Sequence, residues 1–262
     1  MPGPGRLERR ELSTLLVDIG NTRVKWALAE AGILTTPARA APHSKIDSVF
    51  AAWTALASPP SAVRLVNVNP APVAAQVTQW VRQHWQRESE VVRAAHAGGG
   101  IEVAYPVPEQ LGADRWLAMV AAQAKGLLPA CLIDAGSAIT VDVVHADGRH
   151  EGGLILAGIA AQAAGLQAIT PGLPVMDRPE LVDDPGRIER FATSTPDALA
   201  IGSLRGTAAA LDGLIAQARQ AIDAPLTVVI TGGDAPTLRA LMVEETDHRP
   251  DLVLEGLARL SS

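Results

Sequence analysis

Two segments of this chain read as copies of each other, and the repetition limits the possible folds more than any other feature. The first is TLLVDIGNTRVKWALAEAG, Thr14 to Gly32, and the second is ACLIDAGSAITVDVVHADG, Ala130 to Gly148. In each copy an apolar run ends in Asp-x-Gly, a small polar residue follows, and a second apolar run begins, a pattern typical of a β-hairpin. Asp134 therefore corresponds to Asp18. A repeated unit of this kind predicts a duplicated architecture.

The turn inside each copy suits a phosphate group and its metal ion. Glycine lets the backbone adopt a positive φ and approach a ligand closely. Such a turn presents N–H groups, hydroxyls and one carboxylate at the same place. We expect Gly20 to Thr22 to touch phosphates and Asp18 to orient Mg²⁺, directly or through water. Two such turns, one from each half and facing each other across a cleft, would hold a nucleoside triphosphate. The alternative is a pair of ordinary hairpin turns, which do not require both Asp and Gly.

Length and composition narrow the class of protein. A chain of 262 residues is long enough for two domains of about 100–150 residues each. A hydrophobic content of 48% with 19% charged residues supports a large core. The net charge of −6 argues against direct nucleic-acid binding, which needs a basic surface. The single cysteine, Cys131, fits a reducing compartment, and its apolar neighbours favour a buried, inert thiol.

Nothing in the pattern predicts a membrane span or a signal peptide. The most apolar stretch, 153–169, contains Gly158, Gln162 and Gly165 and is shorter than the about 20 residues that a span needs. Residues 1–13 lack the hydrophobic centre of a signal peptide and predict a mobile N-terminal tail. The expected location is cytoplasmic.

Periodicity predicts the same order of strands and helices twice. In the first half we expect strands at 14–19, 23–29 and 63–68 and helices at 46–56, 73–85 and 116–125. In the second half we expect strands at 131–133, 139–145, 226–230 and 252–254 and helices at about 160–169, 198–221 and 238–242. The class is α/β, with an N-terminal domain at 14–127 and a C-terminal domain at 128–262.

The segment Leu111-Gly112-Ala113-Asp114-Arg115 joins a carboxylate to a guanidinium beside a glycine. A carboxylate here can accept the proton of a substrate hydroxyl, and the guanidinium can bind a carboxylate through two hydrogen bonds. The plainer interpretation is a helix cap, with Asp114 capping the helix at 116–125 and Arg115 in solvent. The residues alone favour the cap.

Three other features have an open interpretation. Thr231-Gly232-Gly233-Asp234 follows a strand and fits either an adenosine contact or a plain strand-to-helix turn. Gly152-Gly153 fits a hinge, a turn near phosphate or a simple loop. The six histidines lack the spacing of metal ligands, so solvated or structural roles are favoured for them. For Trp80 and Trp85, packing on one face of a helix is favoured over a cofactor site.

Taken in register, the motifs resemble the type III pantothenate kinases, the family that includes the Bvg accessory factor proteins. The resemblance runs from about Leu15 to Leu257 through seven segments: DIGNTRVKW, YPVPEQLGADRW, DAGSAITVD, EGGLILAGI, FATSTPDALAIG, TGGDA and DLVLEGL. No single segment is specific, but seven in order are. The resemblance implies the duplicated actin-like fold of the acetate and sugar kinase, heat-shock and actin superfamily, with two domains around a cleft.

For this chain the resemblance implies ATP-dependent phosphorylation of pantothenate, the first step towards coenzyme A, with Asp114 as the general base. The implied cofactors are ATP, Mg²⁺ and a monovalent cation, K⁺ or NH₄⁺. The implied ATP contacts are Asp18, Ile19, Gly20, Asn21, Thr22, Arg23, Val24, Lys25 and Ser137. The implied pantothenate contacts are Tyr105, Gly112, Ala113, Asp114, Arg115 and Thr195. Asp134 would bind the monovalent cation and Asp18 would lie near Mg²⁺.

The family's members are dimers, so a homodimer is expected, and the apolar positions of the alanine-rich helix at 198–221 fit either a dimer contact or burial within one subunit. Two alternatives stay open. One is a regulatory accessory protein that keeps the fold and affects gene expression, and the other is a sugar kinase of the same superfamily. Retention of Asp18, Asp114, Arg115 and Asp134 favours catalysis. The departures from the family's pattern are Ser137-Ala138, GGLILAG without its usual proline, and FATST.

Overall fold

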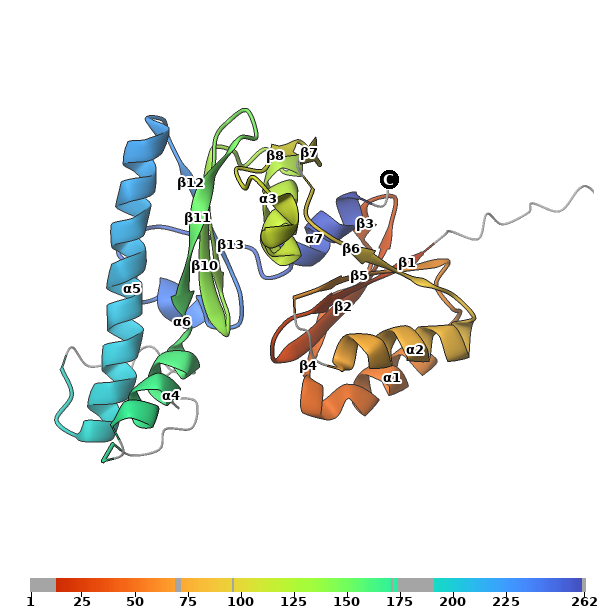
Figure 1. Cartoon of the computed structure of the whole chain (residues 1–262), viewed down its shortest axis with the longest axis horizontal. Coiled ribbons are helices and arrows are strands. Elements are labelled where there is room, and N and C mark those ends of the chain that lie inside the picture. Colours follow the sequence, from red (N-terminus) through yellow and green to blue (C-terminus); the bar gives the residue numbers. More distant parts are fainter. Residues whose placement is uncertain (1–12, 69–71, 96, 171, 174–190, 261–262) are drawn as a thin grey trace, which may run out of the picture. The chain divides into compact units, whose positions relative to one another are not determined.

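The computed structural model, drawn as a ribbon in Figure 1, describes residues 13–68, 72–95, 97–170, 172–173 and 191–260. Tertiary contacts divide the chain into two compact units. The first comprises Met1–Val92 and Leu257–Ser262, and the second comprises Arg93–Gly256. Each unit contains one main β-sheet.

The first unit is built on a mixed sheet of six strands. They are β1 (Thr14–Ile19), β2 (Arg23–Glu30), β3 (Ile33–Leu34), β4 (Arg39–Pro42), β5 (Ala62–Asn67) and β6 (Ser89–Val92). The order is β3-β2-β1-β5-β6, and β4 also pairs with β2. Strands β1 and β2 are antiparallel, whereas β5 is parallel to both β1 and β6. The predicted hairpin at 14–29 is thus confirmed.

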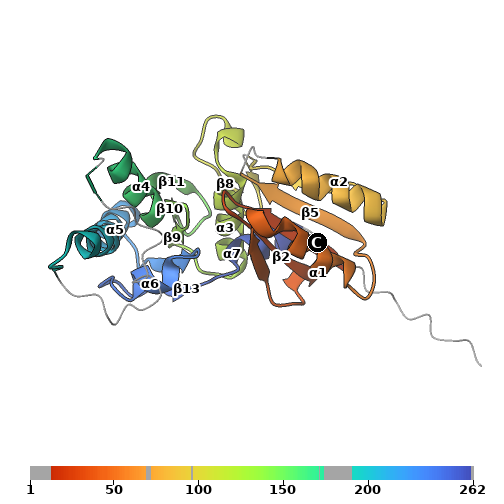
Figure 2. The same cartoon turned by 90° about the horizontal axis from the view of Figure 1, so that it is seen from below.

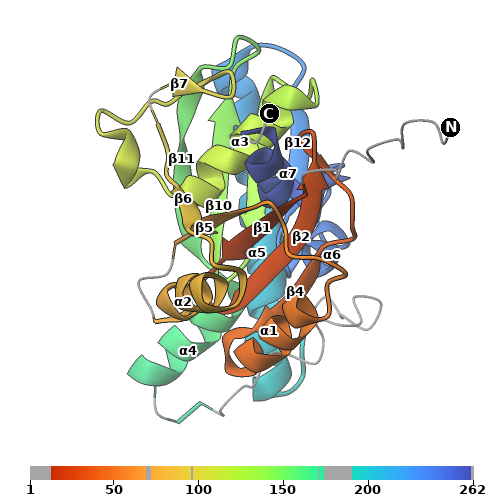
Figure 3. The ribbon, with the colours of Figure 1, turned by 90° about the vertical axis from the view of Figure 1, so that its right-hand side faces the viewer.

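Two helices cover one face of this sheet, α1 (Ile46–Thr54), which follows a 3-10 turn at His43–Lys45, and α2 (Val73–Trp85) (Figure 3). In α2 the buried residues Val73, Val77, Trp80 and Val81 recur at helical spacing, so one apolar stripe faces the strands. Trp80 stacks on Phe50 of α1 with ring centroids 5.3 Å apart. The packing role predicted for the tryptophans of α2 is therefore confirmed.

Among its described residues, the second unit contains a five-stranded sheet, a small hairpin and four complete helices. The strands are β7 (Ala97–Gly98), β8 (Ile101–Glu102), β9 (Ala130–Ala135), β10 (Ala138–Val144), β11 (His150–Ala157), β12 (Thr227–Thr231) and β13 (Asp247–His248). The helices are α3 (Ala113–Ala124), after a 3-10 turn at Pro108–Gln110, α4 (Ile159–Ile169), α5 (Thr195–Ile222) and α6 (Ala235–Arg239). The last helix, α7 (Leu252–Arg259), begins in the second unit.

The five-stranded sheet of the second unit lies between two layers of helices. Helices α4, α5 and α6 cover one face, where Cys131, Ile133 and Ile139 join the apolar residues of α5 in one core (Figures 1 and 2). Helix α3 covers the opposite face and contacts β9 and β10. Because successive residues of a strand point to opposite faces, Asp134, Thr140 and Asp142 point away from α5 and towards α3.

The two main sheets have the same topology, which bears out the duplication in the sequence. The first follows the order β3-β2-β1-β5-β6 and the second β11-β10-β9-β12-β13. In both, three antiparallel strands lie side by side. The strand at one side of these three, β1 or β9, also pairs in parallel with β5 or β12, and one further parallel strand, β6 or β13, lies beyond it. Asp18 is the next-to-last residue of β1, as Asp134 is of β9, so the two carboxylates have equivalent places in the two sheets.

Three details differ from the sequence prediction. The expected strand at 252–254 is wrong, because these residues form the first turn of α7, and the apolar run continues at helical spacing through Leu257 and Ala258. Residues 150–157 form strand β11, which the prediction lacked. Helix α6 spans Ala235–Arg239, earlier in the chain than the predicted 238–242.

The limits of the predicted domains, 14–127 and 128–262, stay a prediction. The contacts divide the chain at 92/93 instead, because α3 packs on β8, β9 and β10 of the second unit. The predicted N-terminal tail lies outside the described residues apart from Ser13.

Helix α5 is long and apolar enough to cross a membrane by length and composition alone. Its apolar side chains Leu204, Leu211 and Ile215 are fully buried in the core of the second unit, so it is a core helix. Burial within one subunit is thus the interpretation that holds for this stripe. Burial raises the pKa of the Cys131 thiol to about 12, as expected for an inert thiol.

Candidate active site

The second unit brings α3 and its sheet together around a small cavity. Six of the lining residues carry polar or charged side chains: Asp114 and Arg115 from α3, Asp134 from β9, Thr140 and Asp142 from β10, and Thr231 from β12. Ala118, Leu132, Ile133 and Leu252 complete the lining. Three of the residues predicted for catalysis, substrate and cation binding, Asp114, Arg115 and Asp134, therefore lie around one space.

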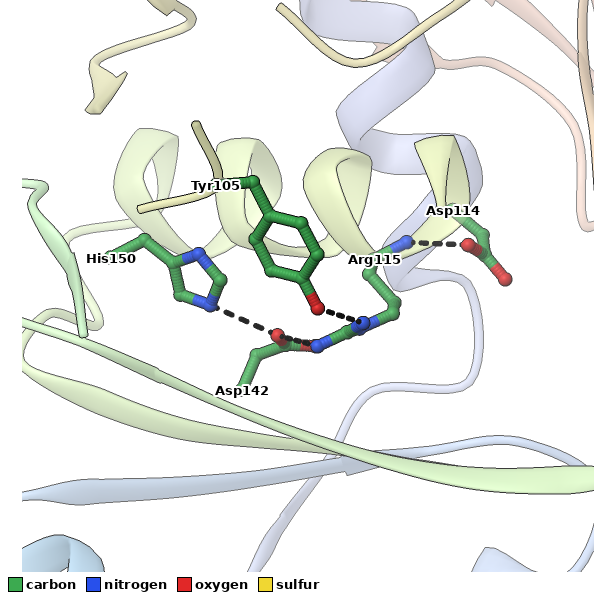
Figure 4. A network of polar contacts seen from close by, with 5 residues as sticks. All are labelled: Tyr105, Asp114, Arg115, Asp142 and His150. Atoms are coloured by element: carbon green, nitrogen blue, oxygen red, sulfur yellow. Dashed lines mark hydrogen bonds and ion pairs between the residues drawn. The ribbon is translucent and has the colours of Figure 1, made fainter. Parts of the chain in front are cut away.

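A buried ion pair joins α3 to the sheet beside this cavity (Figure 4). Arg115 Nε donates to Asp142 Oδ2 at 2.8 Å and Nη2 donates to Oδ1 at 2.6 Å, a two-bond arrangement. Both side chains are almost fully buried, with 5% and 3% of their surface exposed. Burial alone would lower the pKa of Arg115, but the hydrogen bonds and charge of Asp142, with a smaller effect of Tyr105, raise it above its ordinary value.

Two aromatic rings extend this network. Arg115 Nη1 donates to the Tyr105 hydroxyl at 3.2 Å, and the guanidinium lies 5.9 Å from the centre of the tyrosine ring. The fully buried His150 of β11 lies with Nε2 3.0 Å from Asp142 Oδ1. Because the carboxylate offers only acceptors, Nε2 is the donor of this bond. The two rings are nearly parallel, with an interplanar angle of 3° (Figure 4).

Asp114 is not the cap of α3. The helix begins at Ala113, and the N-cap position is Gly112. Asp114 Oδ1 instead accepts the backbone N–H of Arg115 at 2.8 Å, and a Cβ on Gly112 would lie only 2.5 Å from that oxygen. Burial raises the pKa of Asp114, and the negative charge of Asp142 raises it further. The hydrogen bond from the Arg115 N–H and the positive charge of Arg115 lower it, but the net effect is a raised pKa. A carboxyl in this setting is suited to exchange protons.

The two Asp-x-Gly turns close in a different way from the one predicted. The expected positive φ at Gly20 and Gly136 is wrong, because neither has a positive φ. Gly20 N–H bonds to the Arg23 carbonyl at 3.0 Å, and Gly136 N–H bonds to the Ala138 carbonyl at 3.1 Å. A Cβ would approach no neighbour closer than 3.6 Å at Gly20 and 3.5 Å at Gly136. The fold itself therefore does not demand glycine at either turn.

The other residues predicted to contact ATP or the substrate do not line the cavity around Asp114. Residues 21–23 of the first turn are exposed and Gly20 is half-buried, whereas Ile19 and Val24 are buried. Ser137 lies exposed in the β9–β10 turn. Thr195 is the exposed first residue of α5, the helix on the other face of the sheet, so it is not part of the cavity around Asp114.

The segment Thr231-Gly232-Gly233-Asp234 has a structural reason for its first glycine. Gly232 has φ +98, and a Cβ there would collide with the Ala135 backbone of the β9–β10 turn. This glycine lets the end of β12 approach that turn closely. An adenosine contact at this segment stays a prediction.

Asp142 and His150 are site residues that the sequence analysis missed. The sequence contained a signal for Asp142. An acidic residue interrupts an apolar strand there, and it lies two residues after Thr140, so the two side chains share one face of the sheet, the face that Asp134 also occupies. His150 gave no local signal, since nothing in its neighbours shows that β11 buries it against Asp142.

Comparison with known structures identifies the fold. A Baf family transcriptional activator from Campylobacter jejuni is 22% identical, with a TM-score of 0.55 over 94% of this chain and 96% of that one. An activator of 2-hydroxyisocaproyl-CoA dehydratase from Clostridium difficile, solved with bound ADPNP, has a TM-score of 0.53 at 13% identity over 95% and 93%. The predicted α/β fold of the duplicated actin-like type is confirmed.

Comparison of sequences identifies the family. A protein of Nitrosococcus oceani named type III pantothenate kinase is 38% identical over 94% of this chain and 93% of its own. One of the same name from Burkholderia vietnamiensis is 35% identical over 95% and 96%. The model of the family "Type III pantothenate kinase" matches residues 14–217. This chain belongs to the type III pantothenate kinase family.

Proposed function

We propose that this protein transfers the γ-phosphoryl group of ATP to the primary hydroxyl of pantothenate, the first step towards coenzyme A. One observation carries the proposal: Asp114, whose carboxylate is held by the Arg115 backbone N–H and has a raised pKa, lines the same cavity as Arg115 and Asp134. An acceptor for a hydroxyl proton, a cationic group and a second carboxylate are what a phosphoryl transfer to an alcohol requires.

In this mechanism Asp114 orients the hydroxyl and accepts its proton as the oxygen attacks phosphorus. Its carboxylate keeps a fixed orientation through the Arg115 N–H. The Tyr105 hydroxyl and the N–H bonds of Arg115 that Asp142 does not occupy contact pantothenate, together with the backbone of Gly112 and Ala113. Thr195, which lies outside this cavity, stays a proposed substrate contact on the ground of the family resemblance alone.

The residues of the first turn fit a phosphate and its divalent ion. Residues 21–23 are exposed, and Asp18, Asn21 and Thr22 supply oxygen donors, which Mg²⁺ prefers. Within the described residues no three His, Cys, Asp or Glu side chains gather as a ligand set. Asp18 would therefore hold Mg²⁺ with water and the phosphates, and the ion would neutralise the charge that develops on them. We propose Asp18 to Lys25 and Ser137 as the ATP contacts.

Asp134 fits a monovalent cation such as K⁺ or NH₄⁺. Its carboxylate shares the cavity with Thr140 and Thr231, its cross-strand neighbours on β10 and β12. These are hard oxygen donors of low total charge, which suit a large singly charged ion.

Assembly as a homodimer is also part of the proposal. Four apolar side chains of the second unit are exposed on β11 and α4: Leu154 at 50%, Ile155 at 67%, Leu166 at 41% and Ile169 at 79%. Strand β11 is an edge strand, and α4 follows it directly. Exposed apolar residues on an edge strand and on the helix that follows it are typical of a surface that a second copy covers. A cytoplasmic location, expected from the single cysteine, completes the proposal.

The test is coupled ADP release with pantothenate and, separately, with a panel of hexoses and pentoses. Turnover with pantothenate alone supports the proposal. Turnover with a sugar and none with pantothenate would make the protein a sugar kinase, and ATP consumption with neither would favour the regulatory alternative.

A further inference from the structure

The Arg115 guanidinium is oriented by Asp142, a residue that is distant from it in the sequence. Arginine has five N–H bonds. Two of these N–H groups donate to Asp142 and one donates to Tyr105, so a substrate anion can accept hydrogen bonds from the remaining two. The direction of these two bonds is set by how Asp142 holds the other edge of the group.

Asp142 is in turn held by His150. The Nε2–H of His150 binds Oδ1, the oxygen that also accepts from Arg115 Nη2, so one carboxylate oxygen joins the histidine and the arginine. The parallel ring of Tyr105 faces His150, which connects the histidine to the hydroxyl that Arg115 binds. The four side chains form one closed set of contacts (Figure 4).

A β-bulge places His150 in this set. Along β10 and β11, Val143 pairs with Gly152 but Val144 pairs with His150, so Glu151 is an extra residue. Gly152 has φ +133, a conformation that side chains of other residues rarely allow. Without the extra residue, His150 would lie on the other face of the sheet from Asp142. The bulge therefore turns the histidine towards the carboxylate.

The next glycine makes room for the ion pair. Gly153 lies directly opposite Asp142 in the register of β10 and β11. A Cβ at this position would collide with Arg115 Nη2 and with Asp142 Oδ1. The two glycines thus have separate roles, one in the backbone bend and one in the space beside the guanidinium. Neither a hinge nor a simple loop explains both.

We propose that Asp142 and His150 are positioning residues, which hold the Arg115 guanidinium and the Tyr105 hydroxyl in the orientation that binds pantothenate. The inference rests on the proposed function for its substrate, but the orientation of Arg115 can be measured without any substrate. Both residues act through Arg115, so their loss affects the binding of pantothenate and leaves the binding of ATP unchanged.

The test compares four variants with the wild type: Asp142→Asn, His150→Leu, His150→Gln and Leu211→Ala. Asparagine keeps the shape of Asp142 and removes its charge. Glutamine keeps an N–H near the position of Nε2, and leucine removes it. Leu211 of α5 is fully buried in the core on the other face of the sheet from the network, so Leu211→Ala reports what a loss of stability alone does. Each variant is measured for Tm, for KM with pantothenate and with ATP, and for kcat.

We expect Asp142→Asn and His150→Leu to raise the KM for pantothenate about 10- to 100-fold, the range seen when a group that orients another side chain is lost. The KM for ATP is expected to stay within about twofold, and His150→Gln to restore most of the pantothenate affinity. Leu211→Ala is expected to lower Tm and to leave both KM values near those of the wild type. Unchanged pantothenate KM in folded Asp142→Asn and His150→Leu, or an equal rise in both KM values, would overturn the inference.

A second measurement separates this inference from the proposed function. In ¹⁵N-labelled protein without substrate, we expect the Arg115 Nε–H signal to exchange slowly with water in the wild type and in His150→Gln, and fast in His150→Leu. If the wild type does not phosphorylate pantothenate, the proposed function fails while this signal still decides the positioning. Equal exchange in all three proteins would refute the positioning role, even if Asp142→Asn does not fold.

Discussion

At the scale of single residues, Asp114 has an environment that favours its protonated form. It is partly buried in the second unit, and its pKa is raised mainly by that burial. A carboxyl whose pKa is higher in the folded than in the unfolded chain stabilises the fold most below the unfolded pKa, and that contribution is lost as pH rises through the folded pKa. At neutral pH the ionised side chain therefore destabilises the protein, as is common for groups that serve catalysis.

The first prediction is that Asp114→Asn raises Tm at pH 7, by a few degrees if about 1 kcal/mol is regained, since this corresponds to about 2–4 °C at this chain length. The gain should shrink as the pH falls and the wild-type carboxyl becomes protonated, because the charge that the substitution removes is then absent from the wild type as well. Glu109→Gln, at an exposed carboxyl shortly before α3, is the matched control and should not change Tm. Thermal melts across pH 4 to 8 provide the measurement. A lower Tm for Asp114→Asn at pH 7 would mean that the carboxylate stabilises the fold.

The second prediction concerns the pH dependence of turnover. Asp114 must be ionised to accept a proton, so the rate should fall as the pH drops through its pKa. Because burial raises that pKa, the acidic limb of kcat should have its midpoint above about 3.9, the ordinary value for aspartate. A pH–rate profile in a mixed buffer of constant ionic strength measures it. A rate that stays constant down to pH 4 would contradict a base with a raised pKa.

The sequence was informative about these residues only where chemistry was local. Asp114 and Arg115 are adjacent, so their motif could be recognised. Asp142 and His150 acquire their roles from pairing of α3, β10 and β11, which tertiary structure decides. The sequence offers Arg115 either solvent or a substrate carboxylate, and it gives no sign of a buried partner on strand β10.

At the scale of secondary structure, β11 shows why Gly152-Gly153 occurs inside a strand. On sequence alone the pair fits a hinge, a turn or a loop, because glycine interrupts the strand pattern that would identify β11. The structure shows a bulge at Gly152 and a close contact at Gly153. The mistaken strand at 252–254 has a related cause, since three apolar residues in a row fit a strand or a buried helix equally well.

The third prediction compares two glycines in different elements. Gly153→Ala should lower the free energy of unfolding by about 1–3 kcal/mol, because the added methyl group overpacks the site of the Arg115–Asp142 pair. Gly206→Ala, on the exposed side of α5 where nothing lies within 4 Å of the new Cβ, should raise it by about 0.5–1 kcal/mol. Urea unfolding of both variants gives the comparison. Similar effects in the two variants would show that space at Gly153 does not matter.

At the scale of the whole molecule, the duplication was the most predictable feature. The repeated Asp-x-Gly segments fall on β1–β2 and β9–β10, and the two main sheets repeat one strand order. What the sequence could not supply was the place of α3, because a helix after the first repeat can pack on either sheet. The homodimer is implied by the family resemblance. The apolar stripe of α5, which fitted either a dimer contact or burial, is buried, and the exposed apolar residues of β11 and α4 are the surface that supports the dimer.

The fourth prediction tests that surface. Ile155→Lys with Ile169→Glu puts charges on two side chains that are 67% and 79% exposed, so the folded subunit should tolerate them. Sedimentation velocity at micromolar concentration should show a dimer for the wild type and a monomer for the double variant. Val243→Lys, at a residue 89% exposed outside β11 and α4, is the control and should stay dimeric. A double variant that remains a dimer would place the contact elsewhere.

The fifth prediction concerns the cation at Asp134. Turnover should rise with K⁺ or NH₄⁺ and respond little to Na⁺ at equal ionic strength, and Asp134→Asn should remove the difference between the salts. Equal activity of the wild type in all three salts would remove the cation role from Asp134.

The most direct test of the central claim is the transfer of phosphate to pantothenate by the wild type and by Asp114→Asn, followed by ³¹P NMR of the product. We predict a phosphate monoester on the primary hydroxyl of pantothenate for the wild type, and a rate about 10²–10⁴-fold lower for Asp114→Asn with ATP binding retained. Glu109→Gln should match the wild type. No ester from the wild type, or a near-normal rate from Asp114→Asn, would contradict the account.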